Sequence, residues 1–265
     1  MAEDIHNAQR MTDPLDPARA RALQATLGMP PDLRAGDALP PFFHQIYFWD
    51  PQVPDALGRD GHPQVGGFIP DMGLPRRMWA AGRLVFHASL RAGTVAERSS
   101  VIEAVTRKTG RSGPLAFVRI RHDLRQRHAL VLSEWQELVY RPDDPAQAPP
   151  KGVEAPAECD FSIPFACDST MLFRYSALTF NGHRIHYDQA YAQEVEGYEG
   201  LVVHGPLLAQ LLMLEAEARL GGLKTFEYRA TAPLMHFETG QICGQGQRFW
   251  IRGPDGRQCM FATAT

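Results

Sequence analysis

A short polar segment in the second half of the chain carries the residue types of acid–base chemistry. Asn181, His183, Arg184, His186 and Asp188 lie within eight positions, in the string NGHRIHYD. An imidazole can accept and donate protons near neutral pH, because its ordinary pKa is about 6.5. A carboxamide can hold a water molecule through hydrogen bonds but carries no charge. The segment could therefore move protons at a bound substrate, although two histidines three positions apart could also be packed residues that share a helical face.

A leucine-rich helix follows and must help to position this segment. The run PLLAQLLMLEAEARL predicts a helix over residues 205–220, with Pro206 where no N–H donor is needed and a glycine pair at 221–222 to end it. Its surface is apolar on almost every side, so we expect other elements to wrap it. The N–H groups of Gly205 and Leu207 in its first turn could hold a carbonyl oxygen that becomes negative during a reaction. A plain helix start with a tight turn explains the same fragment.

Two strings give this region a family resemblance. The first is LTFNGHRIH at residues 178–186, and the second is HGPL at residues 204–207. With them the sequence resembles the MaoC-like hydratases and dehydratases of the hotdog fold, and within these the branch that includes mesaconyl-C4-CoA and itaconyl-CoA hydratases. The resemblance covers residues 173–265 well and the first half of the chain only in general layout. It implies an α+β fold of the double-hotdog type, with two antiparallel sheets, each wrapped around a long central helix.

The resemblance also implies roles for the residues of the first string. It places His186 at the catalytic histidine, Asn181 at the usual aspartate and His183 at the usual asparagine. His186 is then expected to act as general base for a water molecule that Asn181 holds. A carboxamide cannot serve as a base, so the two-residue acid–base scheme of the family cannot be copied to this chain.

The implied reaction is the addition of water to the α,β double bond of an enoyl-CoA thioester. Gly205 is expected to hydrogen-bond the thioester carbonyl, with His204 and Leu207 beside it as substrate-binding residues. The branch implies a dicarboxylic substrate, mesaconyl-C4-CoA or itaconyl-CoA, which is hydrated to citramalyl-CoA. A guanidinium can grip a free carboxylate with two parallel hydrogen bonds, and Arg174 and Arg184 are the candidates nearest in sequence. Coenzyme A is then part of the substrate, and no other cofactor is expected.

Other interpretations stay open on the sequence. Arg184 could instead pair with Asp188 or Glu194. The same chemistry in reverse would make the protein a dehydratase of carrier-protein-bound 3-hydroxyacyl chains. A metal-dependent hydrolase could use four residues of the two strings as ligands: His183, His186, Asp188 and His204. The family motif already explains three of these four, so no metal is expected. A non-catalytic acyl-binding protein is the last alternative.

Composition argues against several classes of partner. The 265-residue chain has a formal net charge of -3 and a pI near 6.4, which gives no support to nucleic-acid binding. No apolar run approaches the roughly 20 residues of a membrane-spanning helix, and the first residues lack the pattern of a secretory signal. The four cysteines have no C-x-x-C spacing and fit free thiols in a reducing compartment. We therefore expect a cytoplasmic enzyme whose partner is an acyl-CoA; whether it forms a homodimer stays open.

The whole chain divides into two units and a linker. Residues 1–141 are expected to form a non-catalytic hotdog half that shapes the substrate tunnel, and residues 169–265 the catalytic half. Residues 142–168 are rich in proline, alanine and charge, as is typical of a linker. We expect a helix at 16–27 and a strand-like run before Asn181. The further expected strands lie at 82–89, 98–109, 114–123, 129–141, 224–233, 241–246 and 248–252.

A glycine- and proline-rich segment, residues 53–77, is long for a loop in a compact domain. Loops of this length often carry function. This one could form a lid or a wall of the substrate channel, with ordinary packing across a cleft as the simpler interpretation. His87, His122 and His128 lie within or beside expected strands without a partner pattern, so we expect structural roles for them.

Overall fold

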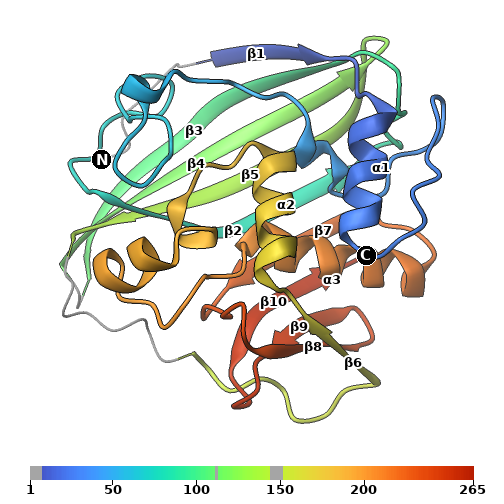
Figure 1. Cartoon of the computed structure of the whole chain (residues 1–265). Coiled ribbons are helices and arrows are strands. Elements are labelled where there is room, and N and C mark those ends of the chain that lie inside the picture. Colours follow the sequence, from blue (N-terminus) through green and yellow to red (C-terminus); the bar gives the residue numbers. More distant parts are fainter. Residues whose placement is uncertain (1–7, 111–112, 144–151) are drawn as a thin grey trace.

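The computed structural model describes residues 8–110, 113–143 and 152–265, and its main feature is one antiparallel sheet of ten strands (Figure 1). The order across the sheet is β1-β3-β4-β5-β2-β7-β10-β9-β8-β6. The strands are β1 (Ala8–Asp13), β2 (Arg76–Phe86), β3 (Ala96–Gly110), β4 (Gly113–Gln126), β5 (Ala129–Arg141), β6 (Phe161–Ala166), β7 (Thr225–Ala230), β8 (Thr239–Gln245), β9 (Arg248–Arg252) and β10 (Gln258–Ala264). Buried positions alternate along β4, so one face of the sheet packs on the core.

The two halves of the chain meet in the middle of this sheet. β2 of the first half pairs with β7 of the second half, and Gly82 stands opposite Tyr228. Glycine is needed at this pairing, because a Cβ at position 82 would lie 2.1 Å from the hydroxyl oxygen of Tyr228. The two sheets that we expected are therefore joined edge to edge into one continuous sheet.

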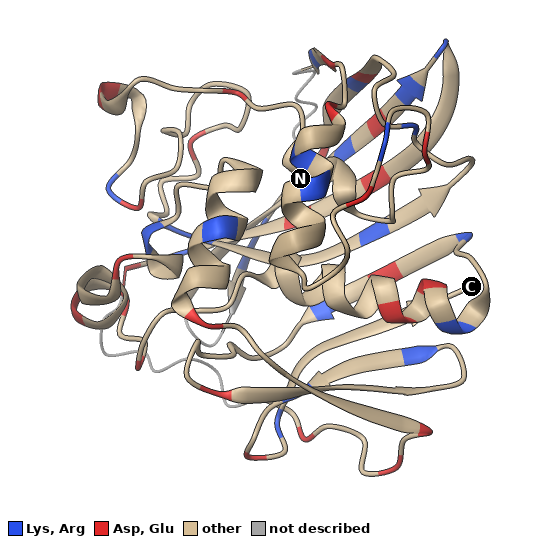
Figure 2. Ribbon diagram, turned by 45° about the vertical axis from the view of Figure 1, so that its right-hand side comes forward, with Lys and Arg blue, Asp and Glu red and all other residues tan. Residues whose placement is uncertain are grey.

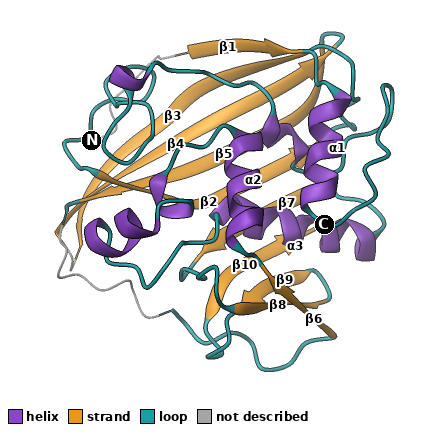
Figure 3. Ribbon diagram, in the orientation of Figure 1, coloured by secondary structure: helices purple, strands orange, loops and turns teal. Residues whose placement is uncertain are grey.

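The helices cover one face of the sheet (Figures 1 and 3). α3 (Gly205–Leu220) is the predicted leucine-rich helix; Pro206 lies in its first turn, and Gly221 ends it in the left-handed conformation with φ 74°. α3 packs against β2, β7, β9 and β10 and is the central helix of the second half. α1 (Pro17–Thr26) confirms the helix predicted near the start of the chain. In the described part of the first half no helix is as long as α3, so the second long central helix was wrongly expected there.

The run before Asn181 is a helix, α2 (Ser169–Thr179), where we expected a strand. The side chain of Asp168 caps it by accepting a hydrogen bond from the N–H of Met171. Leu172, Tyr175 and Ser176 are buried at helical spacing. The apolar run is too short for its sequence to distinguish the helical period of 3.6 residues from the strand period of two. Tertiary packing therefore decides that this segment is a helix.

Part of the predicted linker is also ordered into the sheet. Residues 161–166 form β6, which pairs with β8 in an antiparallel register that places Ser162 opposite Cys243. Residues 144–151 of the linker lie outside the described part of the chain. The strand β6 thus lies within the segment that we expected to be a linker.

The first half contains two short 3₁₀ turns, η1 (Phe43–Ile46) and η2 (Pro54–Ala56), and a buried polar network lies between η1 and the sheet. The carboxylate of Glu134, on β5, lies 2.8 Å from Nε2 of His44 and accepts a hydrogen bond from Gln45. His122 is buried beside it, with Nδ1 2.7 Å from Oγ of Ser100. These partners agree with the structural role expected for His122.

Acidic and basic residues are interspersed along the strands and helices (Figure 2). No described helix is both long and apolar enough to cross a membrane. All four cysteines are free thiols, and Cys159 is the one that is not fully buried.

Candidate active site

His186 lies in a buried 3₁₀ turn at the end of the polar string, η3 (Arg184–His186). Its Nδ1 lies 2.7 Å from the carbonyl oxygen of Val202. A carbonyl can only accept, so Nδ1 carries the proton and Nε2 keeps a free lone pair. Burial lowers the pKa of His186 to about 3, because a charged imidazole loses its hydration in the interior. His186 is therefore neutral at pH 7, and its unprotonated Nε2 is free to accept a proton.

The ring of His186 stacks on the ring of His204, with centroids 3.7 Å apart and 21° between the planes. His204 is the N-cap residue of α3 and is fully buried. Its Nε2 lies 2.8 Å from Oγ of Ser176 on α2, while its Nδ1 has no partner in the described part of the chain. Burial, followed by the neighbouring His186, lowers the pKa of His204 well below 6.5. The stack thus joins His186 to the start of the leucine-rich helix.

The first turn of α3 provides backbone donors beside these rings. The N–H groups of a first helical turn have no acceptor within the helix. No acceptor for the N–H of Gly205 is found among the described residues. Gly205 packs on the indole of Trp79, since an added Cβ would lie 3.5 Å from its Cε3 atom. The positive end of the helix dipole, about half an elementary charge, adds to the ability of these donors to hold a developing oxyanion.

Asn181 follows α2, whose C-cap residue, Phe180, adopts the left-handed conformation with φ 53°. The side-chain oxygen of Asn181 accepts a 3.0 Å hydrogen bond from the backbone N–H of His183. The backbone N–H of Asn181 donates to the carbonyl oxygen of Ser176. The carboxamide oxygen thus shapes the turn toward His183 and His186. Its amide nitrogen remains available to bind a water molecule.

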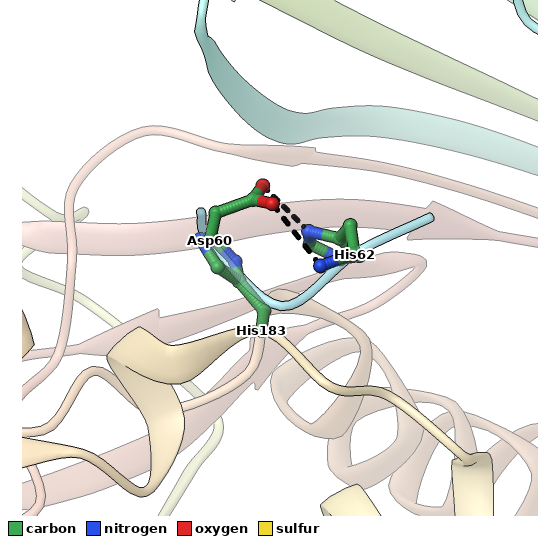
Figure 4. Close-up of side chains that lie close together, drawn as sticks. All are labelled: Asp60, His62 and His183. Atoms are coloured by element: carbon green, nitrogen blue, oxygen red, sulfur yellow. Dashed lines mark hydrogen bonds and ion pairs between the residues drawn. The ribbon is translucent and has the colours of Figure 1, made fainter. Parts of the chain in front are cut away.

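A second pair of side chains comes to this site from the first half of the chain. Asp60 and His62 lie in the segment after β1 and α1 and contact His183, as Figure 4 shows. Nδ1 of His62 lies 2.9 Å from Oδ2 of Asp60, and the backbone N–H of His62 donates to Oδ1 at 3.1 Å. The rings of His62 and His183 have centroids 4.5 Å apart, and those of His183 and His186 5.3 Å. Three imidazoles therefore run in sequence from the Asp60 carboxylate to His186.

The charge states of this row follow from burial. Burial, and then the charge of Arg77, lowers the pKa of His62 to about 4. Burial also lowers the pKa of His183, and the neighbouring His62 and His186 add to the effect. Although burial raises the pKa of Asp60, its hydrogen bonds with the ring and the backbone of His62 bring it below its ordinary value. At pH 7 the row thus consists of one carboxylate and neutral imidazoles.

Two glycines allow the segment with Asp60 and His62 to dock on the polar string. A Cβ at Gly61, where φ is 84°, would lie 2.0 Å from the carbonyl oxygen of Gly182. A Cβ at Gly182 would in turn lie 2.4 Å from the carbonyl oxygen of Gly61. The N–H of Arg184 donates to the carbonyl of Asp60 at 2.9 Å, which fixes the contact. No side chain other than hydrogen fits between the two backbones.

The two arginines proposed from the sequence differ in their surroundings. Arg184 forms an ion pair with Asp188, with Nη2 2.7 Å from Oδ2, and its guanidinium lies 4.2 Å from the ring centroid of Tyr191. This geometry is the alternative that we left open for Arg184. Arg174 is exposed on α2, and within the described residues it has neither an ion pair nor a side-chain hydrogen bond.

A third arginine, Arg77, faces the site without an acidic partner. It stands opposite Tyr140 in the pairing of β2 with β5, so both side chains point to the same face of the sheet. Tyr140 is buried under residues 68–74 of the long loop. The positive charge of Arg77 contributes to the lowered pKa values of His62 and His183. Within the described chain Arg77 has no ion pair, unlike Arg76, which binds Asp143.

No pattern in the sequence placed Asp60, His62 or Arg77 beside the polar string. Their distance from the polar string exceeds 100 positions, and no local motif links them to it. The one available signal was the glycine- and proline-rich composition of residues 53–77, which suggested a channel wall.

The described residues contain one set that could hold a metal ion: Asp60, His62 and His183, whose ligand atoms lie within 4.8 Å of one another. The four side chains that the metal-dependent hydrolase alternative would use as ligands do not form such a set among the described residues. Asp188 is paired with Arg184, and His204 is bonded to Ser176.

A sheet that packs on a central helix, whose first turn meets a neutral buried histidine, is the arrangement that we expected for the class of hotdog thioester hydratases and dehydratases. The model of one family in this class, hydroxyacyl-thioester dehydratase type 2, matches residues 42–236. The chain belongs to this family.

Two related sequences and two solved structures are similar to this chain over most of its length. The chain is 43% identical to a mesaconyl-C(4)-CoA hydratase of Chloroflexus aurantiacus, over 98% of this chain and 95% of the relative. It is 28% identical to a mitochondrial hydroxyacyl-thioester dehydratase type 2 of Schizosaccharomyces pombe, over 81% of this chain and 80% of the relative. The crystal structure of HtdX of Mycobacterium tuberculosis superposes with a TM-score of 0.69 at 16% identity, over 97% of this chain and 98% of that one. A double-hotdog protein of the same bacterium gives a TM-score of 0.62 at 14% identity, over 98% and 96%. The expected double-hotdog fold is confirmed.

Proposed function

We propose that the protein is a hydro-lyase that adds water to the α,β double bond of an enoyl-CoA thioester. The proposed substrate is mesaconyl-C4-CoA or itaconyl-CoA, and the product is citramalyl-CoA, as in itaconate degradation. The observation that carries the proposal is the stack of His186 on His204, which places a basic imidazole beside the donors at the start of α3. The 43% identity to a mesaconyl-C(4)-CoA hydratase over nearly the whole chain supports the substrate class.

The proposed reaction needs a base, an acid and a site for negative charge. Nε2 of His186 takes a proton from water while the water oxygen forms a bond to the β-carbon. The π electrons move toward the thioester carbonyl, whose oxygen is held by the N–H of Gly205. A proton added at the α-carbon then restores the carbonyl and completes the hydration. The amide nitrogen of Asn181 holds the water, and His204 and Leu207 line the carbonyl site.

The two halves have different roles in this proposal. The half at residues 169–265 supplies His186 and the oxyanion donors, and the half at residues 1–141 forms the wall of the substrate tunnel. The enzyme would act in the cytoplasm, where its four thiols stay reduced, and a homodimer is compatible with it. Coenzyme A enters as part of the substrate, and neither a metal nor a further cofactor takes part.

A panel of thioesters tests the proposal. Purified protein is incubated with mesaconyl-C4-CoA, itaconyl-CoA and crotonyl-CoA, and with the matching acyl-carrier-protein thioesters, and mass spectrometry follows the gain of one water. We expect the highest kcat/KM for a CoA ester with a distal carboxylate. A clear preference for carrier-protein thioesters would instead support the dehydratase function that the name of the Schizosaccharomyces pombe relative describes. No turnover of any ester, combined with tight binding, would leave a non-catalytic acyl-binding protein.

A further inference from the structure

The string LTFNGHRIH at residues 178–186 contains no carboxylate, and the resemblance to MaoC-like hydratases places Asn181 at their usual aspartate. A carboxamide neither accepts nor releases a proton in the working pH range. His186 alone would then have to take a proton from water and also return one to the α-carbon. The structure brings another carboxylate to the site from the other half of the chain, at Asp60.

Asp60 holds His62 in one orientation. Both carboxylate oxygens accept hydrogen bonds from His62, Oδ2 from the ring Nδ1–H at 2.9 Å and Oδ1 from the backbone N–H at 3.1 Å. This double contact fixes the ring and its tautomer, so the free lone pair is on Nε2. The side chains of Asp60 and His62 are 17% and 16% exposed, so the pair lies largely out of bulk water.

The His62 ring is connected to the catalytic ring through His183. His183 lies between the two, with centroid distances of 4.5 Å to His62 and 5.3 Å to His186. The ring planes of His183 and His186 are nearly perpendicular, at 86°, so the edge of one ring faces the other. Within the described residues the side chain of His183 has no hydrogen-bond partner, which leaves its nitrogens free for a proton or a water molecule.

We infer that Asp60 and His62 form the second acid–base unit of the site, in place of the carboxylate that position 181 lacks. This inference rests on the proposed hydratase function. His186 takes the proton from water as the C–O bond forms at the β-carbon, and the π electron pair becomes the new C–H bond at the α-carbon. His183 passes this proton from His186 to Nε2 of His62, and His62 delivers it to the α-carbon, so that all three rings are neutral again at the end of the turnover. Asp60 is a positioning residue that holds the His62 tautomer and stabilises its protonated form.

The surroundings favour this role over a metal site. Each oxygen of Asp60 already accepts a hydrogen bond from His62. The guanidinium of Arg77 lies close enough to lower the pKa of both His62 and His183. This positive charge opposes the binding of a cation by Asp60, His62 and His183.

Kinetics of four variants test the inference. We expect His62→Gln to lower kcat by roughly 10² to 10⁴-fold with little change in KM, because general acid–base catalysis is worth about that factor. Asp60→Asn should lower kcat by at least tenfold and alter the pH profile of kcat, whereas Asp60→Glu should recover part of the rate. Imidazole added to His62→Ala should restore turnover in proportion to its concentration, which a purely structural role would not produce. His128→Gln, at an exposed position in the turn between β4 and β5, is the control.

Substitution of the docking glycine gives a test that leaves the pair itself intact. Gly61→Ala should displace Asp60 and His62 from His183, because its Cβ would overlap the carbonyl oxygen of Gly182. Gly66→Ala is the matched control, since its φ is also positive, at 108°, while no atom lies within 4 Å of an added Cβ. We expect Gly61→Ala to lose at least tenfold more kcat than Gly66→Ala.

The outcomes separate the two proposals. If the wild-type protein hydrates an enoyl-CoA and the His62 and Asp60 variants stay within threefold of it with unchanged pH profiles, the acid–base unit is refuted and the hydratase function stands. If the wild-type protein hydrates none of the thioesters, both the hydratase function and the acid–base unit are refuted. If elemental analysis finds one equivalent of metal that is lost in His62→Gln, and chelation abolishes activity, the three side chains form a metal site and the inference is overturned.

Discussion

The imidazole of His186 stacks on that of His204 with 3.7 Å between the ring centroids, at the point where α3 begins. One nitrogen of each ring forms a hydrogen bond outside α3. Nδ1 of His186 bonds to the carbonyl oxygen of Val202, and Nε2 of His204 bonds to Oγ of Ser176 on α2. These two bonds fix the stack from both sides. The orientation of the proposed base is therefore set by packing that surrounds the start of the central helix.

Removal of the proposed base should stop turnover without unfolding the protein. We expect His186→Ala to lower kcat for the best enoyl-CoA by roughly 10² to 10⁴-fold, because it deletes the group that accepts the proton of water. Steady-state kinetics measure the loss, and circular dichroism and a urea denaturation curve check the fold. His128→Gln, in the exposed turn between β4 and β5, is the control. A rate close to that of the wild type would exclude His186 as the base.

Arg77 should select substrates with a free carboxylate. It faces the site without an acidic partner among the described residues, and a hydrogen bond to a charged group is worth about 1.5–3 kcal/mol. Arg77→Gln should therefore lower kcat/KM for mesaconyl-C4-CoA by roughly 10- to 100-fold, with less than a threefold effect on crotonyl-CoA.

Arg184→Gln is the matched variant for this comparison. Its ion pair with Asp188 is 40% and 30% exposed, and solvent screens such a pair, so its loss should have little effect on the fold. The ratio of kcat/KM values for mesaconyl-C4-CoA and crotonyl-CoA should stay unchanged in Arg184→Gln. A change of this ratio in Arg184→Gln but not in Arg77→Gln would assign carboxylate recognition to Arg184 instead.

Stability should fall as the pH drops below neutrality. Burial lowers the pKa of His186 to about 3 and the pKa values of His62 and His122 to about 4. Between pH 6.5 and 4.5 the unfolded chain therefore binds protons that the folded protein does not, and the free energy of unfolding rises with pH. Each histidine contributes up to about 1.4 kcal/mol per pH unit in this window. Urea midpoints at pH 7, 6 and 5 measure the trend, and equal midpoints would contradict the assigned neutral rings.

The buried Glu134 network should be a major contribution to the stability of the first half. Burial raises the pKa of Glu134, but His44 and its other partners lower it to about 2, so the carboxylate is charged and paired. Glu134→Ala leaves these partners unsatisfied and should cost about 3–5 kcal/mol. Glu103→Ala breaks a partly exposed pair with Arg121 and should cost less than about 1 kcal/mol. Similar losses for both variants, by chemical denaturation, would refute the importance of the network.

The local signals in the chain predicted some parts of the structure well. Pro206 and the glycine pair after residue 220 mark both ends of α3, because capping depends on neighbouring residues alone. The strands of the first half follow the alternating pattern of their own sequence. The run before Asn181 was mistaken for a strand, since its helical state is decided by the packing of Leu172 and Tyr175 under neighbouring elements.

The sequence by itself determined the string around His186, the central helix and the membership of a hotdog family, all of which depend on residues close together in the chain. Only the tertiary structure decided that β2 pairs with β7 to join the two halves, and that Asp60, His62 and Arg77 reach the same site. The residues in these contacts lie more than 100 positions apart, so no local pattern in the sequence indicates that they meet. They depend on how the sheet closes around α3 and on two facing glycines, Gly61 and Gly182, that let the backbones touch.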